Sequence, residues 1–490
     1  MLHPIFLLLP ILLPILGGFS LIPLKLKSAR VRNVLSECIV IVTSILVWVA
    51  LFCVRKDAVT IYSFTSGFSV DFRMDGAGAL FAGMVSVMWP LVMLYAFDYM
   101  KGAKRGNMFF SFYVMTYGIT LGIAFASNMT TLYTFFEMLT LVTIPLVSFY
   151  ESRESRYAGR KYAAFCIGGA SMGLFAVVMT TVFGNAGNFT YGGCLTEGYA
   201  PGLMELAFLF GFFGFGVKAA VFPLYDWLPT ASVAPTPVTA LLHAVAVVNS
   251  GVFAVMRLVY FTFGADMLKS TFAARLALSV SIASLLFSAW MALCEGHFKR
   301  RLAYSTVSNL SYMLLGLMLL TPAGLEAGLM HMLFHGIIKM SLFLCAGAFM
   351  HVTGNSYISD IKGVGKKMPV TFAFYTLGAL SLTGIPLFCG FVSKWHLLTA
   401  GIKEGTNFGI AGALALVVAA FLCAVYTLSV SIYAFFCPQD EDKYRGNGRI
   451  KEAGPFMLIP IAVFGVMNVV LGIWPGPVVE FIQRIAEGIL

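Results

Sequence analysis

The chain has 490 residues, of which 59% are hydrophobic and 11% are charged. Soluble domains carry about 25% charged residues, so this composition excludes a soluble protein and indicates a polytopic membrane protein. The net charge of +10 would suggest nucleic acid in a soluble protein. Basic loops between membrane spans already explain it, so we expect no nucleic-acid partner.

Apolar runs of about 20 residues, the length needed to cross a bilayer, recur along the whole chain. We predict an all-α fold of fourteen spans, at residues 3–23, 33–54, 76–98, 107–126, 129–149, 163–184, 203–223, 237–261, 272–293, 302–320, 326–350, 369–402, 409–436 and 454–475. The first run has no basic segment before it, so it resembles a retained span more than a signal peptide. Residues 60–75 alternate apolar and polar side chains around Gly67, which predicts a small external hairpin.

Two predicted spans are interrupted. The seventh ends at Pro223, and Gly384-Ile385-Pro386 divides the twelfth. Proline removes a backbone donor and clashes with the preceding turn, and interrupted helices in the two halves of a transporter point to its ion path. Loops on one side carry 21 of the 32 Lys and Arg residues, which predicts that both termini lie outside the cytoplasm.

A few ionisable side chains lie inside these apolar runs. They are Glu137, Lys218, His243, Arg257, His331, His335, Lys339 and Lys394. A cation at the bilayer centre costs at least about 2.5–3.5 kcal/mol, so it usually faces a protein interior or a water-filled path. Arg257 lies near a predicted helix end, where it could reach the interface. We expect the others to form a line that handles protons.

Glu137 lies at the centre of the fifth span, and Lys218 precedes the break at Pro223. An ion pair that forms and breaks between them would decide whether the lysine holds its proton. Carbonyls freed at the break, and water, could solvate the ammonium. The alternative is that both groups serve helix packing.

His331, His335 and Lys339 recur at every fourth residue, which places them on one helix face and favours a relay. A metal site at the two histidines is an alternative, but no carboxylate is near in sequence and Lys339 would repel a cation. His243 suits a relay or packing equally. Lys394 follows the break in the twelfth span, and its alternative role is to reach the interface.

Nine cysteines are scattered without a CxxC or similar spacing. Neither a zinc site nor an iron–sulfur cluster is therefore predicted, and we expect no cofactor in this chain.

Long motifs resemble those of a known family. They are FFGFGVKAAVFPLYDWLPTASVAPTPVTALLHAVAVV, HFKRRLAYSTVSNLSYMLLG, HMLFHGIIKMSLFLCAG, DIKGVGKKMP and LTGIPLFCGFVSKW. The family comprises antiporter-like subunits of respiratory complex I and large subunits of Mrp-type Na⁺/H⁺ antiporters and of energy-converting membrane-bound hydrogenases. The resemblance runs from about Phe110 to Phe436. It implies two inverted five-helix repeats, spans 4–8 at 107–261 and spans 9–13 at 262–437, preceded by 1–106 and followed by 438–490 with span 14 and a short external tail.

The resemblance also implies roles. Glu137 and Lys218 would form the charged pair of the first half, and His243 would begin the link between the halves. The three span-eleven groups would continue it, and Lys394 would be the terminal lysine. Many relatives have a lysine where this chain has Asn249, so the link relies on His243 and water, or this copy conducts poorly.

We therefore expect a proton- or Na⁺/H⁺-translocating subunit of a complex I-like or hydrogenase complex, with redox chemistry on other chains. Expected partners are other antiporter-like and small membrane subunits, and peripheral redox subunits with iron–sulfur clusters. The expected location is a prokaryotic cytoplasmic membrane. Alternatives are a dedicated Mrp-type antiporter subunit, a non-conducting scaffold and a stand-alone solute carrier.

Overall fold

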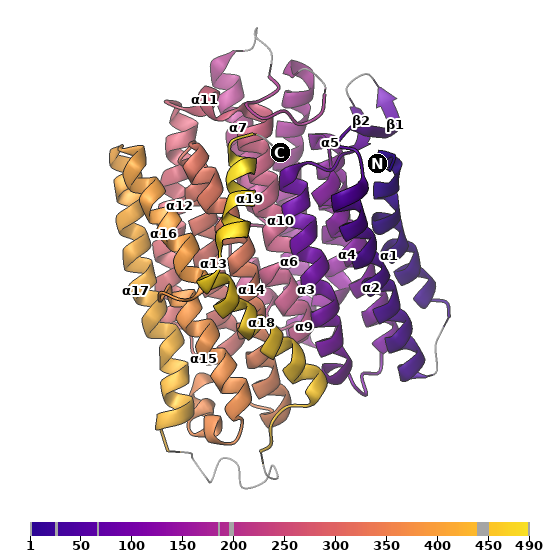
Figure 1. The fold of residues 1–490 in the computed structure, drawn as a ribbon, viewed down its shortest axis with the longest axis vertical. Helices are drawn as coiled ribbons and strands as arrows, with labels where there is room; N and C mark the ends of the chain where they lie inside the picture. The colour runs from indigo at the N-terminus through magenta and orange to yellow at the C-terminus, as the bar shows by residue number, and fades with distance from the viewer. Residues whose placement is uncertain are drawn as a thin grey trace.

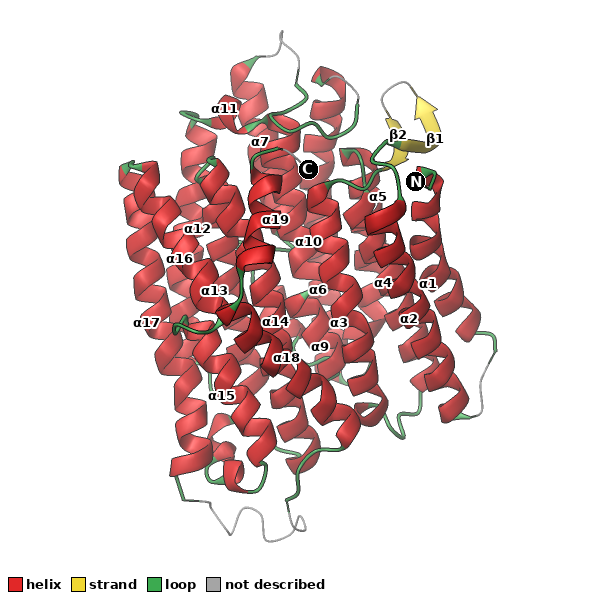
Figure 2. Ribbon diagram, in the orientation of Figure 1, coloured by secondary structure: helices red, strands yellow, loops and turns green. Residues whose placement is uncertain are grey.

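The computed structural model describes residues 2–24, 28–65, 68–184, 187–195, 200–438 and 450–488. These residues form a bundle of helices that run along one common direction, with a two-stranded sheet at one end (Figures 1 and 2). The chain begins and ends near the end of the bundle that carries this sheet (Figure 1).

The N-terminal part comprises η1 (Pro4–Leu7), α1 (Leu8–Leu21), α2 (Ala29–Cys53), β1 (Val59–Thr65), β2 (Phe68–Phe72) and α3 (Gly76–Tyr99). The strands pair antiparallel within the predicted hairpin segment, and Gly67, around which the hairpin is predicted, lies outside the described residues. Side chains cap the first turns of α2 and α3. Ser28 caps α2, and the Asp75 carboxylate accepts a hydrogen bond from Gly78 N at 2.9 Å at the start of α3.

The middle part comprises α4 (Gly106–Phe125), α5 (Met129–Val147), α6 (Arg153–Phe183), α7 (Pro201–Gly216), α8 (Trp227–Ala231), α9 (Thr236–Ala244), α10 (Val247–Met256), the π-helix η2 (Arg257–Phe263) and α11 (Ala265–Leu268).

The last part comprises α12 (Phe272–Cys294), α13 (Phe298–Met318), α14 (Pro322–Thr353), η3 (Ile358–Ile361), η4 (Val364–Lys366), α15 (Pro369–Thr383), α16 (Cys389–Glu404), α17 (Asn407–Phe436), α18 (Pro455–Ile473) and α19 (Gly476–Ala486).

Eleven helical segments of the described chain are long and apolar enough to cross a membrane, counting α9, α10 and η2 as one. The helices α7 and α15 are apolar but shorter. The predicted multi-span helical fold is therefore present, whereas the exact number of fourteen spans stays a prediction.

The seventh and twelfth spans are interrupted near the predicted proline and glycine residues. The first interruption begins earlier in the chain than predicted. The helix α7 ends at Gly216, seven residues before Pro223, so Lys218 lies within the break instead of before it. The Val221 amide bonds Gly216 O at 3.0 Å and closes the last turn. In the twelfth span, Gly384 ends α15 with φ of +94°, a conformation that glycine adopts without a steric penalty.

The eighth span is also interrupted, which the sequence analysis did not predict. The helix α9 ends at Ala244 and α10 begins at Val247. The break contains neither proline nor glycine. Instead, the Asn249 side-chain amide donates to Ala244 O at 2.8 Å and takes the place of a backbone donor.

Two segments form the centre of the bundle. The α9–η2 segment is buried throughout, and α14 is buried over nearly all of its length. The outer helices expose large apolar side chains, such as Phe421 and Phe436 on α17. The interior thus holds a few polar and charged side chains within a large apolar core, and the outer faces of the helices are also apolar.

The helix α19 follows the last long helix, where the sequence analysis expects only a short external tail. Its buried face contains Ile482 and Ile485, and it packs against α14. The Tyr191 hydroxyl donates to Ala486 O at 2.6 Å and attaches the end of α19 to the loop after α6.

Candidate functional site

Glu137 on α5 and Lys218 in the break after α7 form a loose ion pair. The Lys218 ammonium is fully buried, and its nitrogen lies 3.8 Å from Glu137 Oε1. The ammonium donates a hydrogen bond to Phe136 O and lies 3.4 Å from the centre of the Phe136 ring. Glu137 Oε1 accepts no hydrogen bond from any described residue. The two charges thus attract each other without a direct hydrogen bond.

The break itself does not supply the carbonyl that solvates Lys218. That carbonyl belongs to Phe136 on α5, while the freed Val217 O accepts from Trp227 Nε1 at 2.8 Å. Our expectation that carbonyls of the break solvate this ammonium is therefore wrong for Lys218. Carbonyls freed at a helix break do solvate the ammonium of Lys394.

Lys394 on α16 binds the end of α15 across the second break. Its ammonium donates to Leu382 O at 2.6 Å and to Thr383 O at 3.4 Å, two carbonyls of the last turn of α15. The same nitrogen lies 5.0 Å from the centre of the Tyr312 ring, and the residue is 5% exposed. No described carboxylate pairs with it.

The α9–α10 segment connects His243, on α9, with the surroundings of Lys218, which α10 contacts. Gly251 on α10 packs against the Lys218 backbone, where a Cβ would overlap Ala219. Two residues earlier, Asn249 holds Ala244 O, next to His243. Asn249 Oδ1 and both ring nitrogens of His243 are buried without a hydrogen-bond partner among the described residues.

His335 on α14 lies next to a residue that packs against the same break. Its neighbour Gly336 packs against Ala244 O, close enough that an added Cβ would lie 3.1 Å from that oxygen. Both ring nitrogens of His335 are buried without a protein hydrogen-bond partner among the described residues. Through the contact of Gly336 with Ala244, α14 places His335 beside the end of α9, which carries His243.

His331, one turn before His335, is held by two polar side chains. Its Nδ1 lies 2.9 Å from the Ser393 hydroxyl, and its Nε2 lies 3.1 Å from Asn309 Oδ1. The Asn309 amide group donates to Ser305 O, which turns the amide oxygen towards the ring. This orientation favours the tautomer with the proton on Nε2. Since both nitrogens are engaged, the pattern does not suit a metal ligand.

Lys339 ends this row on α14. Its ammonium donates to Leu302 O at 3.0 Å and to the Ser305 hydroxyl, both on α13. Lys339 follows His335 by one turn and His331 by two turns on the same helix. The predicted axis residues other than Glu137 are thus buried in the bundle interior, whereas the Glu137 side chain is half-buried.

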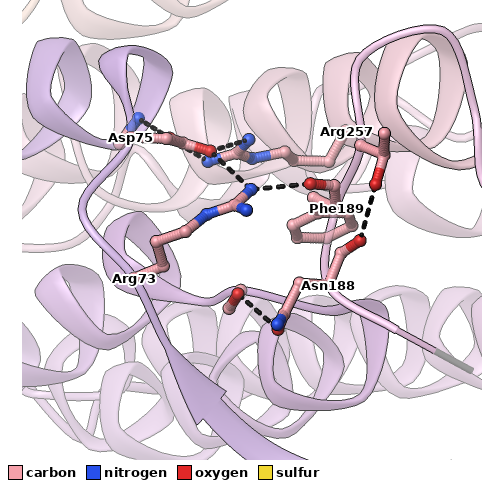
Figure 3. Close-up of polar contacts among 8 residues, drawn as sticks. Arg73, Asp75, Asn188, Phe189 and Arg257 are labelled. Carbon is pink, nitrogen blue, oxygen red and sulfur yellow. Dashed lines mark hydrogen bonds and ion pairs between the residues drawn. The ribbon is translucent and has the colours of Figure 1, made fainter. Parts of the chain in front are cut away.

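Arg257 does not reach the interface, contrary to the sequence-based expectation. It is fully buried at the start of η2 and forms a bidentate pair with Asp75, with two N–O distances of 2.6 Å (Figure 3). Three phenylalanine rings surround the guanidinium, with ring centres 4.7–4.9 Å from Cζ. A carboxylate distant in sequence satisfies the charge, so no snorkelling is required.

Asp75 also joins this pair to the loop after α6. Arg73 lies 3.4 Å from Asp75 and donates to Phe189 O at 2.6 Å (Figure 3). The Phe189 amide in turn bonds Ser127 O at 2.6 Å, next to the start of α5. The cluster therefore fixes the ends of α3, α5 and η2 relative to one another.

Sequence reasoning misses Lys299, because hydropathy places it among the loop residues. It is 4% exposed at the start of α13 and donates to Ala234 O at 2.8 Å, in the link between α8 and α9. It lines a cavity of about 530 Å³ together with Glu154, His297 and Arg300. A hydrophobicity window cannot find it, because its neighbours are basic.

Burial, followed by the neighbouring Lys299, lowers the pKa of His297 to about 4. The ring caps α13, since Nδ1 accepts from the Arg300 amide at 3.4 Å. At neutral pH this residue is an uncharged hydrogen-bond acceptor at the rim of the cavity.

Sequence reasoning also misses Glu326 on α14 as a partner of His396 on α16. His396 Nε2 lies 3.7 Å from Glu326 Oε1, and both side chains are partly exposed. His396 follows Lys394 by two residues, so this pair lies beside the last lysine of the row.

Residues 126–423 match the family model described as "NADH:quinone oxidoreductase/Mrp antiporter, TM". The chain belongs to this family. It is an integral, multi-pass membrane protein of the antiporter-like class, as predicted.

Two curated relatives show how much of the family fold the chain covers. NADH-quinone oxidoreductase subunit N of Desulforudis audaxviator is 31% identical over 427 residues, which are 84% of this chain and 83% of that protein. A Na⁺/H⁺ antiporter protein of Alkalihalophilus pseudofirmus is 31% identical over 439 residues, 84% of this chain and 53% of that protein. The chain thus spans about half the length of the antiporter protein.

Two solved structures share the fold over nearly the whole chain. A chain of the archaeal membrane-bound sulfane sulfur reductase superposes with a TM-score of 0.85 at 22% identity, covering 99% of this chain and 97% of that one. A chain of the Mrp complex from a Dietzia species gives a TM-score of 0.86 at 21% identity, with the same coverage. These family members belong to multi-subunit membrane complexes.

Proposed function

We propose that this chain moves protons through the membrane along the row Glu137, Lys218, His243, His335, His331, Lys339 and Lys394, with Asn249 between Lys218 and His243. The observation that carries the proposal is the fully buried Lys218 ammonium, which is paired with Glu137 at 3.8 Å and not hydrogen-bonded to it. Breaking a pair without a direct hydrogen bond requires less reorganisation than breaking a bidentate one. Lys218 can therefore exchange its proton as Glu137 moves.

Unpartnered polar atoms support a wet path between these groups. Both nitrogens of His243 and of His335 and one oxygen of Asn249 are buried without partners among the described residues. Buried polar atoms of this kind usually bind ordered water. A chain of water molecules would join the ring nitrogens into a proton wire.

The composition of the row favours protons over Na⁺. It contains three lysines and three histidines, but Glu137 is its one carboxylate. Na⁺ is a hard cation that needs several oxygen ligands, by analogy with Mg²⁺ and Ca²⁺. Lysine ammonium groups would repel it, whereas neutral imidazole and lysine transfer protons.

The cavity at Lys299 would supply protons to the row. It opens at the end of the bundle opposite the β1–β2 sheet, beside the α8–α9 link. His297 lies at its rim, and the buried Lys299 donates to Ala234 O just before α9, the helix that carries His243. The excess of basic residues in the loops at this end supports a cytoplasmic location, with both termini outside.

The parent assembly that fits best is a complex I-like or hydrogenase-type complex in a prokaryotic cytoplasmic membrane. The matched region covers 83% of the quinone oxidoreductase relative but 53% of the antiporter relative. Partners would be other antiporter-like and small membrane subunits, with iron–sulfur redox subunits supplying the energy. A dedicated Mrp-type antiporter is the alternative, and co-purification of an iron–sulfur protein would exclude it.

The test is proton pumping by the complex reconstituted in vesicles and followed with an entrapped pH dye. Glu137→Gln and Lys218→Gln should each reduce pumping to background while assembly, seen by gel filtration, is unchanged. The matched control is Lys269→Gln, which removes a lysine from the exposed pair with Asp266. Normal pumping in either axis variant would refute the proposal.

A non-conducting scaffold is the second candidate, because Asn249 cannot carry a proton as the lysine of many relatives can. His335→Ala separates the two functions. It should abolish pumping if the row conducts, and it should leave pumping unchanged if the chain only holds other subunits in place.

A further inference from the structure

A second cavity, of about 590 Å³, lies where α1 and α3 end and α2 and α4 begin. These four helices are long and apolar enough to span a membrane, so the cavity lies at the boundary between lipid and water. It is at the end of the bundle opposite the β1–β2 sheet, since α2 ends and α3 begins beside that sheet (Figure 1).

Arg32 is the buried cation of this cavity. It is 9% exposed, and its guanidinium lies 4.8 Å from the centre of the Phe110 ring. Its hydrogen-bond acceptors are the amide oxygens of Asn33, at 2.9 and 3.1 Å, and of Asn107, at 3.5 Å. No carboxylate of the described chain forms an ion pair with it, although buried charges are usually paired.

The rest of the lining adds positive charge. Lys104 and Arg105 line the same cavity, and Arg105 shares its charge with the half-exposed Glu151. Gly106 begins α4 directly against Arg32, because a Cβ there would overlap the guanidinium. No described side chain caps this helix start, so its backbone adds a partial positive charge.

A neighbouring cavity shows the contrast. It has a volume of about 570 Å³ and is lined by Arg30 and Lys101 but also by the carboxylates Glu37 and Asp98. Those carboxylates would repel an anion. The Arg32 cavity has no acidic lining residue among those described.

We propose that the Arg32 cavity binds a phosphate group, with the guanidinium as its main ligand. An arginine fork matches phosphate oxygens in bidentate geometry, and basic pockets at the ends of membrane helices suit anionic lipid headgroups. Met100 and Met108 supply an apolar wall for the part of a lipid next to its phosphate. Inorganic phosphate offers the same oxygens, so the experiment must separate the two sources.

The test uses the full-length chain purified in a non-ionic detergent, with bound lipid counted by native mass spectrometry. Phosphatidylglycerol should remain bound in preference to phosphatidylcholine. Arg32→Gln should weaken phosphatidylglycerol binding at least about tenfold, the effect of losing one charge-assisted hydrogen bond. Arg30→Gln is the control, because it removes the same charge from the same helix but lines the other cavity.

Lys104→Gln keeps the proposal testable if Arg32→Gln does not fold, because Lys104 is exposed. It should weaken phosphatidylglycerol binding about threefold, as expected for one surface charge. Competition by millimolar inorganic phosphate, with no preference among lipids, would identify free phosphate as the source. Unchanged phosphatidylglycerol binding in both the Arg32 and Lys104 variants would overturn the proposal.

Discussion

Two buried cation–carboxylate pairs join distant parts of the bundle in different ways. Arg257 and Asp75 meet through two hydrogen bonds of 2.6 Å, and three aromatic rings enclose the guanidinium. Lys218 and Glu137 stay 3.8 Å apart, and the Glu137 side chain is 24% exposed. The first pair is closed and rigid, whereas the second can separate.

The chemistry of the two cations agrees with this difference. Arginine keeps its charge under all physiological conditions and matches a carboxylate with a planar fork, so it suits a fixed connection. Lysine is a point charge that can lose its proton when buried. We infer that Arg257–Asp75 holds the start of η2 in place while Lys218–Glu137 changes state.

Lys218→Arg tests most directly whether the two pairs differ in function. The variant keeps the positive charge beside Glu137 but cannot release a proton, so pumping should fall to background. The measurement is proton uptake by vesicles that contain the reconstituted complex. Pumping at the normal rate would mean that Lys218 supplies charge alone, and the two pairs would then have the same role.

Arg257→Gln should mainly affect stability. Removing one partner of a buried pair typically costs about 3–5 kcal/mol, since Asp75 is left buried without its main counter-charge. Thermal unfolding of the purified chain in detergent measures the loss. Lys269→Gln is the control, because it removes an exposed partner of Asp266 worth about 0–1 kcal/mol. An unchanged melting temperature for Arg257→Gln would contradict the assigned structural role.

Asn249→Leu tests the segment between the two pairs. The substitution removes the donor to Ala244 O and leaves that carbonyl unsatisfied at the break, so we expect a loss of about 1–3 kcal/mol in unfolding free energy. Ser250→Ala is the matched control, as its hydroxyl bonds Ala246 O in an ordinary turn. Equal stability of the two variants would show that the side-chain amide does not support the break.

The smallest expected effect concerns His297, at the rim of the cavity beside Lys299. Burial and Lys299 lower its pKa from the ordinary 6.5 to about 4, so the unfolded chain binds a proton more readily than the folded one. Its contribution to stability is present above pH 6.5 and is lost as the pH falls towards 4.

His297→Gln should therefore reduce the acid sensitivity of unfolding between these two pH values. The measurement is the difference in melting temperature between the native chain and the variant, followed across this range. A difference that does not change with pH would show that the ring is not kept neutral by its surroundings.

Local sequence was enough to predict the membrane class, the helical fold and two of the three helix breaks. Hydropathy and proline are local properties, and the backbone must satisfy its hydrogen bonds within each apolar segment. The eighth break was not predictable, because a side chain, Asn249, makes it without any proline or glycine. Family motifs also pointed to the axis residues, whose roles stay predictions.

Which charged groups meet depends on how the helices assemble. Arg257 pairs with Asp75, from which it is separated by 182 residues in the sequence. Lys339 hydrogen-bonds the α13 backbone at a residue 37 positions away in the sequence. Lys299 and Arg32 are buried although both lie among basic residues. Pairing across helices depends on the angles at which the helices pack and on the position of each charge along its helix. The sequence of one helix does not encode these quantities, so charge partners become known only when the helices are packed together.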